Sequence, residues 1–197
     1  MNKHILTLVL LVGLATVSNA QMAAEIDTKN SIVSWTGSKL FQYSNHYGTV
    51  AFKSGAIMKE DNKIVGGEFA VDMHTITNTD GKYNDMLVGH LKNRDFFDVG
   101  KYPEAKLKFI DVIHKDMETI EVLADLTIKG ITNKIRFKGK RKVFDGKEVL
   151  TTKFIIDRTL WGVNYESKGF LGSLKDDIIS DAIEFEVTLE WKADDKC

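Results

Sequence analysis

Three histidines are the side chains with which this sequence could most readily hold a metal ion. His46, His74 and His90 share no short spacing, whereas zinc sites draw their ligands from pairs a few residues apart. The neighbouring residues place His74 on the wet face of a strand, and His46 lies in the polar segment SNHYG. We therefore expect no metal site, and we expect no cofactor.

The motifs of common enzyme classes are also missing. The sequence contains no GxSxG nucleophile elbow and no Walker-type phosphate loop. Its one cysteine is the last residue, Cys197, so no intrachain disulfide can form, and an intermolecular bridge or an idle tail both remain open. Asp95 and Asp98 are close in sequence, but paired carboxylates need a pocket and a raised pKa to act as acid and base. Asp98, near Tyr102, fits turn chemistry better. We therefore expect a protein that is not an enzyme.

Two polar residues are candidates for contacts in a binding site. Arg158 follows an apolar strand and precedes the aromatic, glycine-rich segment TLWGVNYESKGF. Its guanidinium could pair with Asp95 or Asp98 and fix that part of the chain, or it could meet a phosphate group of a ligand; the structural pair is the stronger interpretation. His90 is interpreted as a helix residue whose ring bonds a backbone group or a strand end. His90 and Arg158 are thus the candidate polar contacts.

The first residues, MNKHILTLVLLVGLATVSNAQ, indicate export. A positive start precedes an apolar run of the length of a secretory h-region, and Ser18 and Ala20 place small side chains before a cut at Gln21. A membrane anchor is the alternative, but the run is shorter than the roughly 20 residues that a span needs. We expect residues 1–20 to be a cleaved signal peptide and residues 21–197 to be one domain in the periplasm or outside the cell. The formal net charge of −1 gives no indication of a nucleic-acid partner.

Period-two alternation dominates the remainder of the chain and is typical of strands with one dry face. In DAIEFEVTLEW, for example, isoleucine, phenylalanine, valine, leucine and tryptophan alternate with glutamate and threonine. Turn-forming pairs in KEDNK and FDGK, and the glycine of KGITN, separate the runs. We expect eight strands, near residues 31–38, 47–58, 63–76, 104–114, 118–129, 131–143, 147–157 and 178–192.

Eight long antiparallel strands must either close into a barrel or pack as a sandwich. Long strands with few breakers favour the barrel, and eight strands enclose either side chains or one small ligand. Dry-face residues would then line the lumen. They are Trp35, Val50, Phe52, Phe69, Val71, Met73, Leu107, Phe109, Ile120, Val122, Leu126, Ile135, Phe137, Phe154, Ile156, Phe185, Val187 and Leu189.

One segment, GKYNDMLVGHLKNRDFF, changes to helical spacing. We expect a short amphipathic helix here, capped by Asp80, that covers one end of the barrel. Met86, Leu87 and Leu91 would face inward, and Phe96 and Phe97 would anchor the chain as it turns back. The only proline, Pro103, would then fix the entry to the next strand.

The segment HLKNRDFFDVGKYPEAKLKF resembles the signature of the YceI family of lipid-binding, lipocalin-like proteins. DLTIKGITNKIRF, IDRTLWGV and SDAIEFEVTLE are similar to further blocks of that family, in the expected order and across essentially the whole mature chain. The opening strand departs from the family pattern: it reads VSWTGSK where members commonly end in Val-Lys-His. The residues that carry the first and most specific block are His90, Leu91, Asp95, Phe96, Phe97, Asp98, Tyr102 and Pro103.

The resemblance implies an extended eight-stranded barrel that holds a long isoprenoid chain, such as a polyprenyl alcohol, a polyprenyl phosphate or an isoprenoid quinone. The leading hypothesis is therefore a non-enzymatic store or carrier of an isoprenoid lipid, without stable membrane insertion after signal cleavage; a homodimer remains open. Two alternatives stay in view. One is an enzyme that acts on a lipid or quinone in the lumen, and the other is a stress-related envelope interaction module with a filled barrel.

Overall fold

The computed structural model describes residues 22–40, 45–81, 84–169 and 178–193 of the chain. The predicted signal peptide and Cys197 lie outside these residues. The elements of the described part follow one another as β1 (Met22–Glu25), β2 (Ile32–Ser38), β3 (Asn45–Glu60), β4 (Lys63–Asn78), α1 (Asn84–Lys92), β5 (Glu104–His114), β6 (Thr119–Ile128), β7 (Ile131–Phe144), β8 (Lys147–Asp157), the 3-10 helix η1 (Arg158–Trp161) and β9 (Ala182–Lys192).

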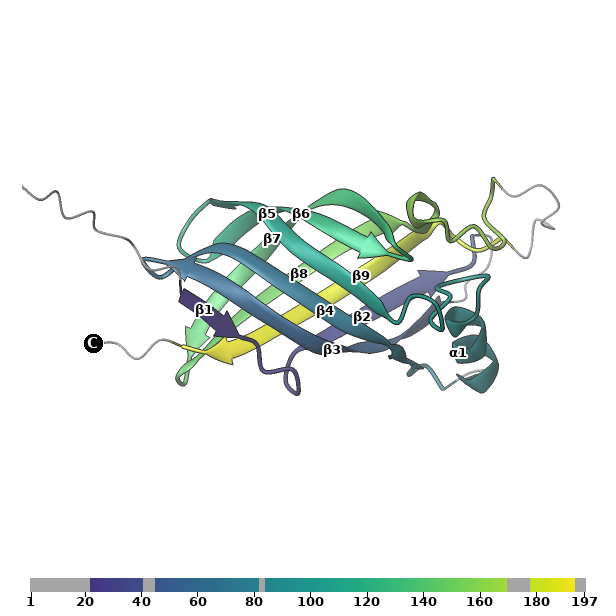
Figure 1. Ribbon diagram of the computed structural model, residues 1–197, viewed down its shortest axis with the longest axis horizontal. Helices are drawn as coiled ribbons and strands as arrows, with labels where there is room; N and C mark the ends of the chain where they lie inside the picture. The colour runs from purple at the N-terminus through teal and green to yellow at the C-terminus, as the bar shows by residue number, and fades with distance from the viewer. Residues whose placement is uncertain (1–21, 41–44, 82–83, 170–177, 194–197) are drawn as a thin grey trace, which may run out of the picture.

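Eight of these strands form a closed antiparallel barrel. They pair in the order β3-β2-β9-β8-β7-β6-β5-β4, and β4 pairs again with β3, so the sheet closes on itself. Closure removes the exposed edges that an open sheet would present to other chains. Figure 1 shows an elongated barrel with α1 at one end and the β3–β4 turn at the other. The predicted extended eight-stranded antiparallel barrel with one short helix is confirmed.

β1 is a strand that the sequence pattern did not predict. It pairs with the C-terminal part of β3, with Met22 opposite Lys59, while β2 pairs with the N-terminal part of β3. Ile26 also bridges Trp191 of β9, so β1 and β2 share one place in the barrel, between β3 and β9. A turn that begins at Asp27 separates β1 from β2. The Asp27 carboxylate accepts hydrogen bonds from the backbone N–H groups of Lys29 and Asn30 in this turn. Four residues reading MAAE are too short to show a period of two.

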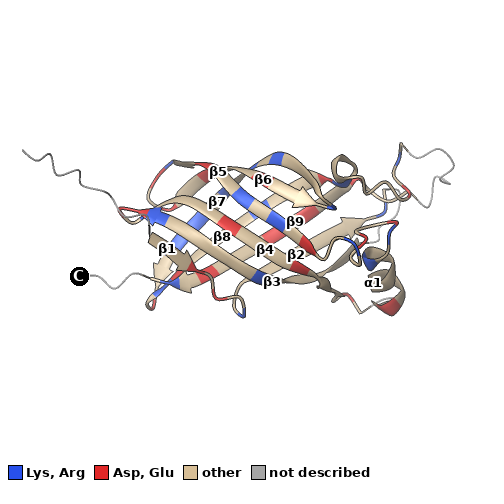
Figure 2. Cartoon of the chain, in the orientation of Figure 1, with Lys and Arg blue, Asp and Glu red and all other residues tan. Residues whose placement is uncertain are grey.

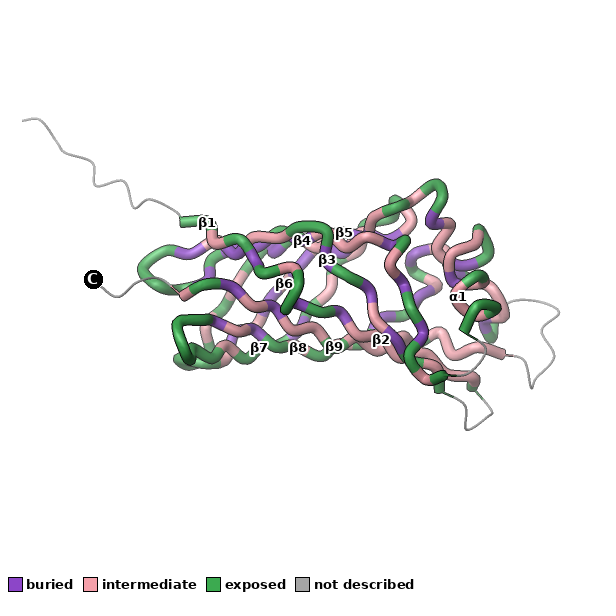
Figure 3. The backbone as a smooth tube through the Cα atoms, turned by 90° about the horizontal axis from the view of Figure 1, so that it is seen from below, coloured by how far each residue is buried: buried purple, intermediate pink, exposed green. Residues whose placement is uncertain are grey.

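The strands alternate between a dry inner face and a wet outer face. Along β6, every second residue from Ile120 to Ile128 is buried, and Figure 3 shows the same alternation of buried and more exposed positions along several strands. Figure 2 shows residues of both charge signs distributed along the strands. Many form cross-strand pairs such as Lys53 with Glu104, whose carboxyl pKa is lowered by the hydrogen bond from Lys53. The core therefore lies inside the barrel.

The two ends of the barrel differ. At the end away from α1, the β3–β4 and β7–β8 connections are two-residue hairpins with positive φ at both central residues, Asp61 and Asn62, and Asp145 and Gly146. Such turns match the twist of the strands that they join. At the other end, the β6–β7 turn at Lys129 and Gly130 is equally tight, but the longer connections that contain α1 and η1 lie there as well.

Helix α1 occupies the segment where helical spacing was predicted, but it begins at Asn84 and Asp80 is not its cap. The Asp80 carboxylate instead accepts a hydrogen bond from Asn78 Nδ2 and contacts the His46 ring. Beyond the helix, Pro103 immediately precedes β5, as expected, and its carbonyl accepts the N–H of Met73.

Candidate functional site: an apolar cavity beneath helix α1

A cavity of about 290 Å³ lies inside the barrel on the side of α1. All eight barrel strands contribute to its wall, and the segment around α1 covers it. The residues predicted for the lumen that line this cavity are Trp35, Val50, Phe52, Phe69, Val71, Met73, Leu87, Leu91, Phe96, Phe97, Leu107, Phe109, Leu126, Phe137, Phe154, Phe185, Val187 and Leu189. Along β9, Ile183 to Leu189 line it at alternate positions, so it extends for ~20 Å along the strand.

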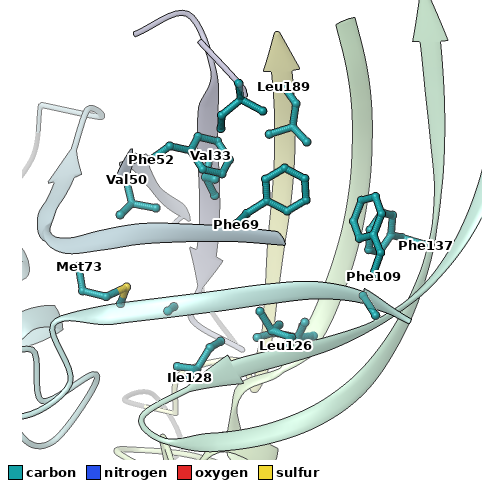
Figure 4. Close-up of a cluster of buried hydrophobic side chains, with 14 of the residues drawn as sticks. Val33, Val50, Phe52, Phe69, Met73, Phe109, Leu126, Ile128, Phe137 and Leu189 are labelled. Atoms are coloured by element: carbon teal, nitrogen blue, oxygen red, sulfur yellow. The ribbon is translucent and has the colours of Figure 1, made fainter. Parts of the chain in front are cut away.

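A series of phenylalanine rings runs around the wall. Neighbouring rings contact one another with centroids 5.3 to 6.3 Å apart, in tilted, edge or stacked arrangements that aromatic pairs favour. Figure 4 shows four of these rings with the valines, leucines and methionine that share the interior. In order of contact the rings are Phe52, Phe69, Phe109, Phe137, Phe154 and Phe185.

Two glycines make room for this series. A Cβ added at Gly55 would lie 2.6 Å from Phe69 Cδ1, and one added at Gly67 would lie 2.9 Å from Phe69 Cε2. Both distances are shorter than a carbon–carbon contact allows. The glycines therefore let the Phe69 ring lie against the wall.

The far part of the barrel is filled by side chains and forms the floor of the cavity. Ile120 and Val122, which we expected to line the lumen, are fully buried there and do not border the cavity. Trp191 lies in this region too, 1% exposed. The alternation showed correctly that these residues point inward, but inward-pointing side chains can either enclose space or fill it.

The floor ends in a buried ionic network. Glu148 accepts a hydrogen bond from Lys59 Nζ at 2.5 Å and another from Arg141 Nε at 2.6 Å. Arg141 also donates to the backbone and side-chain oxygens of Asn62 in the β3–β4 turn. Because these charges are paired, they can close this end of the barrel without leaving a lone charge in a dry interior.

Helix α1 covers the opposite end with one of its faces. Leu87 and Leu91 border the cavity, and Phe96 and Phe97 extend the cover beyond the helix. The expectation that Met86 faces inward is wrong, because this side chain is 62% exposed. His90 does not border the cavity either. Its ring lies beside the Tyr165 ring, with the ring centres 5.7 Å apart, and does not make the expected backbone hydrogen bond.

Arg158 borders the cavity, but its partners differ from those predicted. It donates to three backbone carbonyls, those of Ser180, Val163 and Ile179, and its guanidinium lies 5.7 Å from the centre of the Phe96 ring. The carboxylate near it is that of Asp181, at 3.6 Å, and not Asp95 or Asp98. Burial lowers the pKa of the Arg158 guanidinium, and Asp181 opposes that shift.

Two further predicted lining residues lie outside the cavity. Ile135 is half-buried and packs against the core, while Ile156 borders a separate hollow at the surface together with Leu40 and Ile179. In contrast, His46 borders the cavity although its segment was interpreted as a polar turn. The signal was present: His46 is in phase with Val50 and Phe52 in the same strand.

Polar side chains that border the cavity gather where α1 covers it. We call this group the polar collar; its members are Ser38, Lys39, His46, Arg158 and Ser180. Within the described part of the chain, no three histidine, cysteine or acidic side chains come together in a way that could hold a metal ion. No helix among these residues is long and apolar enough to cross a bilayer.

Comparisons of sequence extend over most of the chain. A UPF0312 protein of Pseudomonas putida strain W619 is 33% identical over 134 residues, which cover 66% of this chain and 68% of the relative. A UPF0312 protein of Staphylococcus aureus strain USA300 is 29% identical over 115 residues, covering 55% of this chain and 63% of the relative.

Solved structures share the fold. BcnA of Burkholderia cenocepacia superimposes with a TM-score of 0.67 at 18% identity, covering 84% of this chain and 98% of BcnA. A domain of Saccharophagus degradans, described as polyisoprenoid binding and implicated in plant cell wall breakdown, gives a TM-score of 0.67 at 15% identity, covering 89% and 100%. The sequence also matches the family described as YceI-like domain over residues 25–191, and with this match the chain belongs to that family.

Proposed function

We propose that this protein binds a long-chain isoprenoid lipid or isoprenoid quinone inside its barrel and stores or carries it without chemical change. The observation that supports this most strongly is the cavity itself, whose wall is built from apolar and aromatic side chains of all eight barrel strands. The solved Saccharophagus degradans domain with the same fold is described as polyisoprenoid binding.

Affinity in such a cavity comes from area. Each 100 Å² of apolar ligand surface removed from water contributes about 2.5 kcal/mol, before the cost of immobilising the ligand. A chain-shaped ligand suits a cavity that runs ~20 Å along a strand better than a compact one does. The collar residues make hydrogen bonds within the fold, such as those of Arg158 to carbonyls, which favours binding over catalysis.

The proposal includes export to the periplasm or the exterior, which rests on the residues 1–20 of the sequence. A carrier in a watery compartment would protect an isoprenoid chain from water between membranes. Because the cavity closes at the ionic network, we infer that the ligand enters from the end that α1 covers.

Native mass spectrometry of protein secreted into a bacterial envelope, followed by solvent extraction, tests the proposal. We expect a stoichiometric adduct that extracts as a prenyl alcohol, prenyl phosphate or prenylated quinone. A folded protein that carries no adduct and takes up neither added polyprenols nor quinones would contradict it, and would favour an envelope interaction module instead. The same spectra report whether the protein is monomeric or dimeric.

A further inference from the structure

Polar groups border the cavity unevenly. Away from the collar, Thr152 is already engaged, because its Oγ1 donates to the carbonyl of Lys138. Lys106 also borders the cavity, but its ammonium pairs with Glu104 and its side chain is 62% exposed on the outside. The wall away from the collar also holds the indole N–H of Trp35, a buried donor that makes no hydrogen bond among the described residues. An apolar chain would fill this apolar remainder of the cavity, which we call the shaft, and a hydroxyl end that needs an acceptor would lie at the collar.

His46 is the collar residue best placed to contact such a polar end. Its Nδ1 lies 2.6 Å from Asp80 Oδ2, and the Asp80 side chain is 5% exposed. Because an ionised carboxylate can only accept, the His46 ring donates through Nδ1–H. Asn78 donates to the other oxygen of Asp80 and keeps the carboxylate in place.

The remaining ring nitrogen is the one available to a ligand. Among the described residues, His46 Nε2 makes no hydrogen bond. In the neutral ring whose Nδ1 carries the proton, Nε2 is an acceptor. It would therefore accept a hydrogen bond from an O–H group and would gain nothing from a carbonyl or an ether oxygen.

The strands connect His46 to the buried arginine. His46 of β3 lies opposite Gly37 of β2, the adjacent carbonyl of Ser38 accepts the N–H of Ser180, and the carbonyl of Ser180 accepts Nε–H of Arg158. With His46 neutral, the cations of the collar are Lys39 and Arg158, and the carboxylates of Asp181, beside Arg158, and Asp80, beside His46, offset their charge. A neutral head suits this balance better than an anionic one.

We propose that the polar collar binds a terminal hydroxyl of the ligand, with His46 Nε2 accepting the hydrogen bond and Asp80 holding the ring in the required tautomer. The preferred ligand is then a prenyl alcohol whose tail fills the shaft and whose hydroxyl lies at the collar. This inference rests on the proposed function and adds the class of head group.

A competition experiment at about pH 8 measures what the head group contributes to binding, separately from the tail. The full mature protein is loaded with equal amounts of geranylgeraniol and its methyl ether, which differ only in the O–H donor, and native mass spectrometry gives the ratio of the two adducts. We expect the wild type to favour the alcohol about tenfold, as one hydrogen bond allows. His46→Leu should reduce this ratio to about one, since no acceptor remains at that position.

Matched variants guard the interpretation. His74→Leu removes an exposed histidine outside the cavity and should keep the tenfold ratio, and His46→Gln should keep part of it because its amide oxygen accepts. Thermal unfolding checks the fold of each. If His46→Leu does not fold, the wild-type ratio and a third probe, geranylgeranyl phosphate, still decide.

The outcomes distinguish this inference from the proposed function. If the wild type binds alcohol and ether equally, or if folded His46→Leu retains the preference, the collar assignment is wrong while tail binding stands. Tighter binding of the phosphate than of the alcohol would overturn the assignment of a neutral head group. If none of the three probes binds, the proposed function fails, and this inference fails with it.

Discussion

Lys59 Nζ lies 2.5 Å from Glu148 Oε1, and each side chain is only 2% exposed. Arg141 holds the second oxygen of Glu148, so removal of this carboxylate would take away the buried acceptor that both cations share at the barrel floor. We expect Glu148→Ala to lower the free energy of unfolding by about 3–5 kcal/mol, as for other broken buried pairs. Urea unfolding monitored by tryptophan fluorescence measures the change.

Glu186→Ala is the matched control, because Glu186 pairs with Lys153 but is 62% exposed. Its loss should cost about 1 kcal/mol or less. The double variant Lys59→Met, Glu148→Leu should be more stable than Glu148→Ala alone, since it removes the desolvated Lys59 ammonium together with the carboxylate that accepts from it and fills the space with apolar side chains. Equal losses for Glu148→Ala and Glu186→Ala would show that the floor network contributes no more than a surface pair.

Gly48 leaves no room for a side chain where β3 lies beside β4 near the collar. A Cβ at Gly48 would lie 1.8 Å from the backbone oxygen of Thr77 in β4, so any side chain forces the strands apart. We expect Gly48→Ala to destabilise the fold by about 2–3 kcal/mol. Gly37→Ala is the control, since a Cβ there meets nothing within 4 Å. Thermal unfolding of both variants tests this, and similar melting temperatures would contradict it.

The sequence predicted the barrel well because one side of each strand is dry. In β9, the alternation of Ile183, Phe185, Val187 and Leu189 directly indicates the inner face, and all four border the cavity. The same rule placed Ile120 inward but could not show that its side chain fills space, since that depends on neighbours from other strands.

Charges and helix rotation were harder to predict. Glu148 is in phase with the inward-facing Leu150, but a charged residue at a strand end looks solvated until its partners from β3 and β7 are known. In α1, adjacent apolar residues Met86 and Leu87 lie about 100° apart, so one faces solvent when the other faces the barrel. Only packing against the barrel decides which.

Helix α1 offers a direct test of that packing. Leu91 is 7% exposed and borders the cavity, whereas Met86 is 62% exposed. Leu91→Ala should cost about 2–3 kcal/mol of stability and weaken lipid retention, because it opens the cover. Met86→Ala should change stability by about 0.5 kcal/mol or less. Chemical unfolding and adduct occupancy report both effects, and a large loss for Met86→Ala would place the wrong face of α1 against the barrel.

The proposed ligand space can be filled without disturbing the outer surface. Val187 borders the cavity on β9, so Val187→Trp should place a ring where the lipid tail would lie. Phe109→Glu should also abolish lipid retention, but it puts a charge among buried rings and therefore risks the fold. The informative variant is Val187→Trp, for which we expect lipid occupancy to fall about tenfold or more, since a loss of about 1.4 kcal/mol is enough.

Thr151→Trp is the control for Val187→Trp, because Thr151 is exposed on the outside of the neighbouring strand β8. It adds the same ring without entering the cavity and should leave occupancy unchanged. Native mass spectrometry after export and purification gives both occupancies, and melting temperatures confirm that the barrels are intact. Undiminished occupancy in a folded Val187→Trp protein would mean that the lipid lies elsewhere, because a filled shaft cannot accept its tail.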